Sequence, residues 1–181
     1  MTSSTLESYA IIDPRSSAAV VEQTQSVALT TLQGKTLGIV THGNWRSWEY
    51  FCDRLENFLS GPGQDVQHQR YQDERPYLDE RYDQIVREVD AAVVGLGNCG
   101  SCTAQVATAA AQLAARGLPV LVVATEGFKS LAEMTLEYRN YPNVQVFTLP
   151  VEYEVMEERD LVRIADERVV DIESALTSKA I

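Results

Sequence analysis

The stretch Ala91-Ala-Val-Val-Gly-Leu-Gly-Asn-Cys-Gly-Ser-Cys-Thr103 joins an apolar run to an alanine-rich segment. Residues 91–96 form a short, continuous apolar run, which is typical of a buried strand. Residues 103–116 are rich in alanine, the strongest helix former, and Gly117 stands where a helix commonly ends. The stretch therefore predicts a buried strand, a glycine-rich turn and a helix, which is the repeating unit of a parallel sheet.

The same alternation continues on both sides of this unit. Further strands are expected at residues 36–40, 66–71, 118–124 and 144–149, and further helices at residues 44–60, 77–89, 128–140 and 157–176. Apolar strands that alternate with helices predict an α/β fold: a doubly wound, mainly parallel five-stranded sheet of the flavodoxin-like or Rossmann-like type. In such sheets a ligand binds beyond the carboxyl ends of the strands, where the strand order reverses.

The chain of 181 residues is long enough for one domain with its own core. Residues 1–33 show no clear period and many Ser, Thr and Gln, so we expect an N-terminal arm that lies on the surface or on a partner. Residues 34–181 are expected to form the α/β domain.

Charge and cysteine content exclude several classes of partner and compartment. The net charge of −11 should repel nucleic acid and anionic membranes. There is no apolar run long enough to span a membrane and no secretory pattern at the N-terminus. The three cysteines are too few for a disulfide framework, so a reducing cytoplasm fits best.

Cys99 and Cys102 form a C-x-x-C pair between the predicted strand and helix, in residues 97–103, which we call the thiol turn. The first turn of a helix leaves backbone N–H groups without partners, and the helix dipole adds partial positive charge there. A thiol in that place should lose its proton more easily than a free thiol. The pattern predicts that Cys99 attacks a substrate and Cys102 resolves the product.

The residues around the pair are candidates for binding the substrate. Backbone N–H groups at the start of a helix can hold a carboxylate or an oxyanion. The candidate substrate-binding residues of this turn are Gly97, Asn98, Gly100, Ser101 and Thr103.

Three other interpretations of the turn remain open. A structural zinc site usually needs a second ligand pair, and only Cys52, His42 and His68 remain to supply it. Gly95, Gly97 and Gly100 match the G-x-G-x-x-G pattern of dinucleotide-binding loops. The small residues could also be inert parts of a tight turn. We expect no metal and no resident cofactor, with an external thiol as the reductant.

Residues 41–47 follow the first predicted strand and should lie beside the thiol turn. His42 is a candidate catalytic base, or a cation beside the thiolate. Asn44 is expected to cap the next helix or to bind substrate. Arg46 is a candidate for binding a carboxylate of the substrate. Trp45 is a candidate for lining the substrate site.

Two further segments complete the set of candidates. Thr125 and Glu126 follow the fourth strand at the same edge of the sheet; Thr125 is a candidate for substrate binding, and Glu126 is either a proton donor or the start of a helix. Cys52 lies on the apolar stripe of a predicted helix and should be a buried, inert thiol. His68 falls in a probable edge strand with no evident partner.

The segment Cys99-Gly-Ser-Cys-Thr103 after a glycine-bearing strand resembles the UGSC family, in which selenocysteine or cysteine occupies the first position. It is similar, more distantly, to the Sec-Gly-Thr-Cys-Thr segment of the selenoprotein B subunit of glycine, sarcosine and betaine reductases. The resemblance covers about residues 34–150. Ala124 departs from it, since relatives often have Cys there. After the last strand many relatives have His-Pro, whereas here Pro150 is followed by Val151 and Glu152.

The resemblance implies that Cys99 stands at the position of selenocysteine. We therefore expect a thiol-dependent enzyme in which Cys99 forms a covalent adduct with a small electrophile, one that can carry a carboxylate. Cys102 or an external thiol then resolves the adduct, by reductive or C–S bond chemistry. Two alternatives remain: an isomerase or lyase of the aspartate/glutamate racemase type, and a non-catalytic subunit. We expect a homo- or hetero-oligomer.

Overall fold

The computed structural model describes residues 29–72 and 79–177. One sheet holds the five strands β1 (Lys35–Thr41), β2 (Val66–Gln72), β3 (Ala91–Gly97), β4 (Val120–Thr125) and β5 (Gln145–Leu149). All pairs are parallel, and the strand order is β2-β1-β3-β4-β5. The predicted doubly wound α/β fold is confirmed, and the order is that of the flavodoxin-like class.

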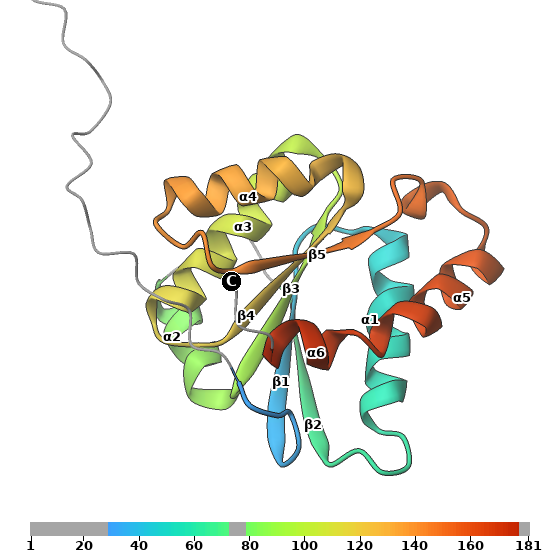
Figure 1. The fold of residues 1–181 in the computed structure, drawn as a ribbon, viewed down its shortest axis with the longest axis horizontal. Coiled ribbons are helices and arrows are strands. Elements are labelled where there is room, and N and C mark those ends of the chain that lie inside the picture. The colour runs from blue at the N-terminus through green and yellow to red at the C-terminus, as the bar shows by residue number, and fades with distance from the viewer. Residues whose placement is uncertain (1–28, 73–78, 178–181) are drawn as a thin grey trace, which may run out of the picture.

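Helices cover both faces of the sheet (Figure 1). One face carries α1 (Arg46–Leu59), α5 (Glu158–Val169) and α6 (Ile172–Thr177). The other carries α2 (Asp79–Glu88), α3 (Gly100–Ala115) and α4 (Lys129–Tyr138). Two short 3-10 turns follow the last two strands: η1 (Glu126–Phe128) and η2 (Tyr153–Val155). The central strands β3 and β4 are buried along their whole length, which explains their continuous apolar sequences.

The strand order reverses between β1 and β3. The chain leaves β1 for β2 on one side and returns to β3 on the other, so the loops after β1 and β3 diverge above adjacent strands. The loop after β1 is tied to the end of β3, since the His42 backbone N–H donates to the Gly95 carbonyl oxygen at 2.7 Å. The thiol turn therefore lies at the point where ligands bind in sheets of this class.

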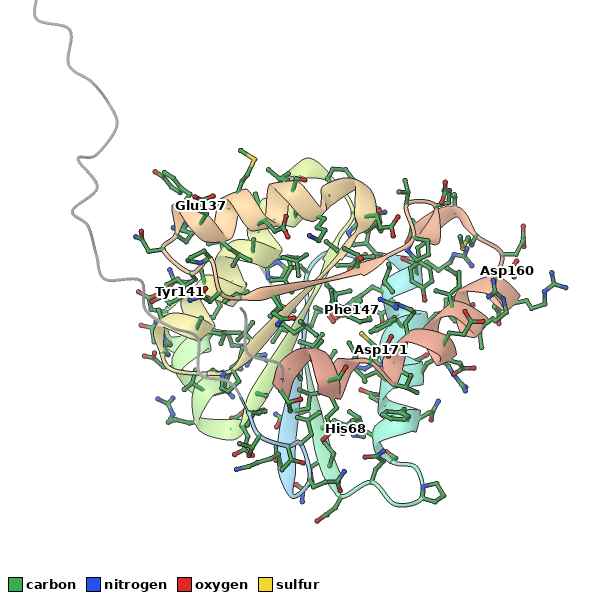
Figure 2. The ribbon with its side chains drawn as sticks, viewed as in Figure 1. His68, Glu137, Tyr141, Phe147, Asp160 and Asp171 are labelled. Carbon is green, nitrogen blue, oxygen red and sulfur yellow. The ribbon has the colours of Figure 1, made fainter. Side chains whose placement is uncertain are left out.

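The helix predicted over residues 157–176 is wrong as a single element, because the structure divides it into α5 and α6. The chain turns at Val170 and Asp171. The Arg168 guanidinium spans this turn, because it pairs with the Asp171 carboxylate at 3.1 Å. Its central carbon also lies 4.5 Å from the centroid of the Phe147 ring. Figure 2 shows Phe147 and Asp171 close to this turn. The apolar period runs through the break, because Val169 and Ile172 are both buried.

Residues at the end of the predicted N-terminal arm pack onto the domain. Leu32 is buried in the core, and its backbone N–H donates to Glu173 on α6 at 3.0 Å. Residues 1–28 of the predicted arm lie outside the described residues, as do residues 77 and 78 at the predicted start of α2.

At Gly95, α1 packs closely against the sheet. A Cβ atom at Gly95 would lie 2.6 Å from the Trp48 ring, closer than packed atoms approach. Trp48 is fully buried, and its Nε1–H donates to Thr41 Oγ1 at 3.1 Å. The indole is thus fixed on β1 and leaves no space for a side chain on β3. The peptide bond from Gly95 to Leu96 is cis.

The substitution Gly95→Ala should lower the free energy of unfolding by about 1–3 kcal/mol, because the added methyl group overlaps Trp48. Urea unfolding with a fitted slope measures this change. Gly100→Ala is the matched control, since a Cβ atom there would meet no atom within 4 Å. It should change stability by no more than about 0.5 kcal/mol. Equal effects of the two substitutions would contradict this account of the packing.

Candidate functional site

Cys99 is the N-cap residue of α3, and its backbone is extended rather than helical. Its Sγ accepts the backbone N–H of Cys102 at 3.1 Å and lies 3.5 Å from the Ser101 hydroxyl. Its carbonyl oxygen accepts both the N–H (2.9 Å) and the hydroxyl (2.7 Å) of Thr103. The sulfur thus takes the place that a serine or aspartate oxygen takes at most helix starts.

The two thiols of the pair differ in acidity. Partial burial raises the pKa of Cys99, but hydrogen bonds from the side chains and backbone N–H groups of Cys102 and Ser101 lower it by more, so the pKa falls below its ordinary value. The pKa of Cys102 is raised, first by burial and then by the neighbouring Cys99 sulfur, and Ser101 and Trp45 only partly oppose this. Cys99 therefore becomes the thiolate first as the pH rises.

The floor of the turn is built by Gly97 and Thr103. A Cβ atom at Gly97 would lie 3.0 Å from Thr103 Oγ1 and 3.1 Å from the Ala124 side chain, so a larger residue would push α3 away from the sheet. Thr103 is fully buried. Both residues, which the sequence predicts as substrate-binding, thus hold the turn in shape. Gly100 and Ser101 instead are exposed, and Gly100 faces open space.

A hydrogen bond joins the loop after β3 to the end of β4. The buried Thr125 hydroxyl donates to Asn98 Oδ1 at 3.0 Å, directly before Cys99. Glu126 follows at the exposed start of η1. The structure therefore brings Asn98 and Thr125 to the thiol turn, and Glu126 to the same edge of the sheet.

The loop after β1 contributes unequally to the site. His42 is 99% buried at the end of β1, where its backbone is bonded to β3. Trp45 is near enough to Cys102 to lower the pKa of that thiol. The Arg46 guanidinium instead donates to the Met156 carbonyl oxygen at 2.7 Å and lies 5.7 Å from the Tyr50 ring. The Asn44 amide oxygen accepts from Gln72 at 3.5 Å.

The predicted capping of α1 by Asn44 is wrong. The N-cap residue is Trp45, whose side chain makes no capping bond. A carboxylate from η2 takes this role, since Glu154 Oε2 accepts the backbone N–H of Ser47 at 3.0 Å and its hydroxyl at 2.5 Å. Glu154 stands 107 residues further along the chain. No local pattern reveals a cap from such a distance.

Cys52 and His68, considered above only as possible zinc ligands, lie on α1 and β2. Cys52 is fully buried on α1, and burial raises its pKa well above the ordinary value, as expected for an inert thiol. His68 lies on the edge strand β2, and its Nδ1 finds no hydrogen-bond partner among the described residues. No group of three or more His, Cys, Asp or Glu within residues 29–72 and 79–177 is arranged to hold a metal ion.

A parallel sheet with a C-x-x-C turn where the strand order reverses defines the class: an α/β protein with two cysteines at the carboxyl edge of its sheet. The model of the UGSC family matches residues 10–178. The chain belongs to the UGSC family, and the match confirms the resemblance seen in the thiol turn. A search of the curated proteins found no match. In the described part of the chain, every helix is too short or too polar to cross a membrane.

The substitution Glu154→Ala should destabilise the protein by about 1–3 kcal/mol, because it leaves the buried Ser47 hydroxyl and N–H without an acceptor. Asn44→Ala is the control, since Asn44 makes no capping bond. It should change the free energy of unfolding by no more than about 0.5 kcal/mol. Urea unfolding compares the two, and a larger loss for Asn44→Ala would restore Asn44 as the cap.

Proposed function

We propose that this protein is a thiol-dependent enzyme in which the Cys99 sulfur forms a covalent adduct with a small electrophile and Cys102 resolves it. The observation that carries the proposal is the hydrogen bond from the Cys102 N–H to the Cys99 sulfur at the start of α3. Hydrogen bonds to the charged form of a thiol favour the thiolate, which is the nucleophile.

The opposite pKa directions of the two thiols suit two successive steps. In the first step, the Cys99 thiolate displaces a leaving group from the substrate carbon and a C–S bond forms. In the second, Cys102 loses its proton and attacks the Cys99 sulfur. A disulfide forms, and the C–S electron pair remains on the substrate carbon, which takes up a proton. An external dithiol then reduces the disulfide and is itself oxidised.

A small substrate that carries a carboxylate fits the start of α3. Gly100 and Ser101 are exposed there, and the positive end of the helix dipole favours an anion. A cytoplasmic location would keep both thiols reduced between turnovers. We also propose that the protein forms an oligomer. Its partner is either a second copy of this chain or a different subunit, such as one like those of the glycine reductase system.

Removal of the resolving thiol should trap the first intermediate. The reduced protein is incubated with a panel of small electrophiles, with and without a carboxylate, and with dithiothreitol as the external dithiol. Intact-mass analysis and peptide mapping then locate the adducts. Cys102→Ser should accumulate an adduct on Cys99, whereas the unsubstituted protein should release product and consume dithiothreitol.

Cys99→Ser is the matched control and should form no adduct in the turn. Adducts on Cys52 or Cys102 that form as fast as those on Cys99 would contradict the proposal. Turnover without consumption of dithiothreitol would favour an isomerase or lyase. If no cysteine reacts faster than Cys52, a non-catalytic subunit is the better account.

A further inference from the structure

Trp45 carries a buried donor without an acceptor. Its indole Nε1 is shielded from solvent and makes no hydrogen bond among the described residues. A buried N–H without a partner is costly, and indole N–H groups usually find one when buried. The other tryptophan of the chain, Trp48, follows this rule by donating to Thr41. Trp45 is therefore an exception: its buried N–H lacks the acceptor that such a donor usually has.

Hydrogen bonds at the start of α1 fix the backbone of Trp45, from which the indole extends. As the N-cap residue of α1, Trp45 accepts the backbone N–H groups of Trp48 and Glu49 at its carbonyl oxygen, at 3.1 and 3.2 Å. Gly43, with a φ of +73°, lies under the ring: a Cβ atom there would be 3.4 Å from Trp45 Nε1. Gly43 therefore lies next to the ring nitrogen within the same loop.

Cys102 on α3 is the candidate acceptor for the buried Trp45 N–H. The loop after β1 and the turn after β3 lie above adjacent strands, and the Trp45 N–H lowers the pKa of Cys102. Ser101 acts on Cys102 in the same direction, whereas Cys99 opposes both. A neutral thiol is a weak acceptor, but a thiolate is a strong one.

We propose that Trp45 is a positioning residue whose indole N–H donates a hydrogen bond to the Cys102 sulfur when that sulfur becomes a thiolate. This inference rests on the proposed function, because it assigns Trp45 to the second step, in which Cys102 attacks the Cys99 sulfur. The indole satisfies its buried donor only in that step, so it favours resolution and leaves the attack by Cys99 unchanged.

An aromatic disulfide probe separates the two steps. The Cys99 thiolate attacks 5,5′-dithiobis(2-nitrobenzoate), forms a mixed disulfide and releases one coloured thiolate. Cys102 then attacks the Cys99 sulfur, forms the internal disulfide and releases the second coloured thiolate. Two protein thiols are oxidised and the probe is reduced to two thiols, so the reaction balances. Stopped-flow absorbance follows a fast and a slow phase across a range of pH.

Trp45→Phe keeps an aromatic ring but removes the N–H and makes the side chain smaller. Loss of one hydrogen bond to a charged group should raise the pH midpoint of the slow phase by about one unit. Below that midpoint the slow phase should be about threefold slower, because tenfold less thiolate is partly offset by the greater nucleophilicity of a more basic thiol. Above the midpoint the variant should match or exceed the unsubstituted protein. The fast phase should stay within about twofold at every pH, since the N–H acts on Cys102 alone.

Trp48→Phe is the matched control, because it removes an indole N–H from the same helix start but one that bonds Thr41. Trp48→Phe should leave the pH midpoints of both the fast and the slow phase unchanged. It also leaves Trp45 as the sole tryptophan, so its fluorescence should titrate with Cys102, and this titration should disappear in Trp48→Phe with Cys102→Ser. This second measurement stands even if Trp45→Phe fails to fold.

An unchanged slow phase in folded Trp45→Phe, or equal slowing of both phases, would overturn the inference. A fluorescence titration that persists without Cys102 would also overturn it. These outcomes differ from failure of the proposed function, in which Cys99 itself would show no fast phase in the unsubstituted protein.

Discussion

The close approach of α3 to the end of β3 is the constraint on which the site depends. Gly97 and Thr103 are in contact there, with no room for a side chain on the strand. This contact fixes the first turn of α3 directly beyond the strand, and Thr103 then holds the Cys99 carbonyl with two hydrogen bonds. The Cys99 sulfur is thereby left as the cap of the helix. The acidity of the thiol follows from this placement.

The site also depends on the strand order of the sheet, because the strand order determines which loops surround the two thiols. The order β2-β1-β3-β4-β5 places the loop after β1 on one side of the turn and the loop after β4 on the other. Thr125 donates a hydrogen bond to Asn98 beside the turn, and Trp45 in the loop after β1 lowers the pKa of Cys102. The thiol pair thus has fixed neighbours on both sides and an exposed start of α3 between them.

Much of this arrangement could be predicted from the sequence, because its causes are local. Continuous apolar runs indicate parallel strands buried on both faces, and a C-x-x-C pair after such a strand indicates thiols at a helix start. The contacts that escaped prediction join distant segments. Glu154 caps α1 from the other end of the chain, and Trp48 on α1 requires the glycine at residue 95 on β3. The break after α5 is hidden because the apolar period continues through it.

The pH dependence of alkylation, measured for each cysteine of the reduced protein by peptide mapping, shows whether the start of α3 activates the Cys99 thiol. Cys99 should react fastest and titrate below the ordinary pKa of a free thiol, whereas Cys102 should titrate above it. If Cys99 instead titrates at or above Cys102, or reacts no faster than the buried Cys52, the turn does not activate its thiol and Cys99 is not the nucleophile.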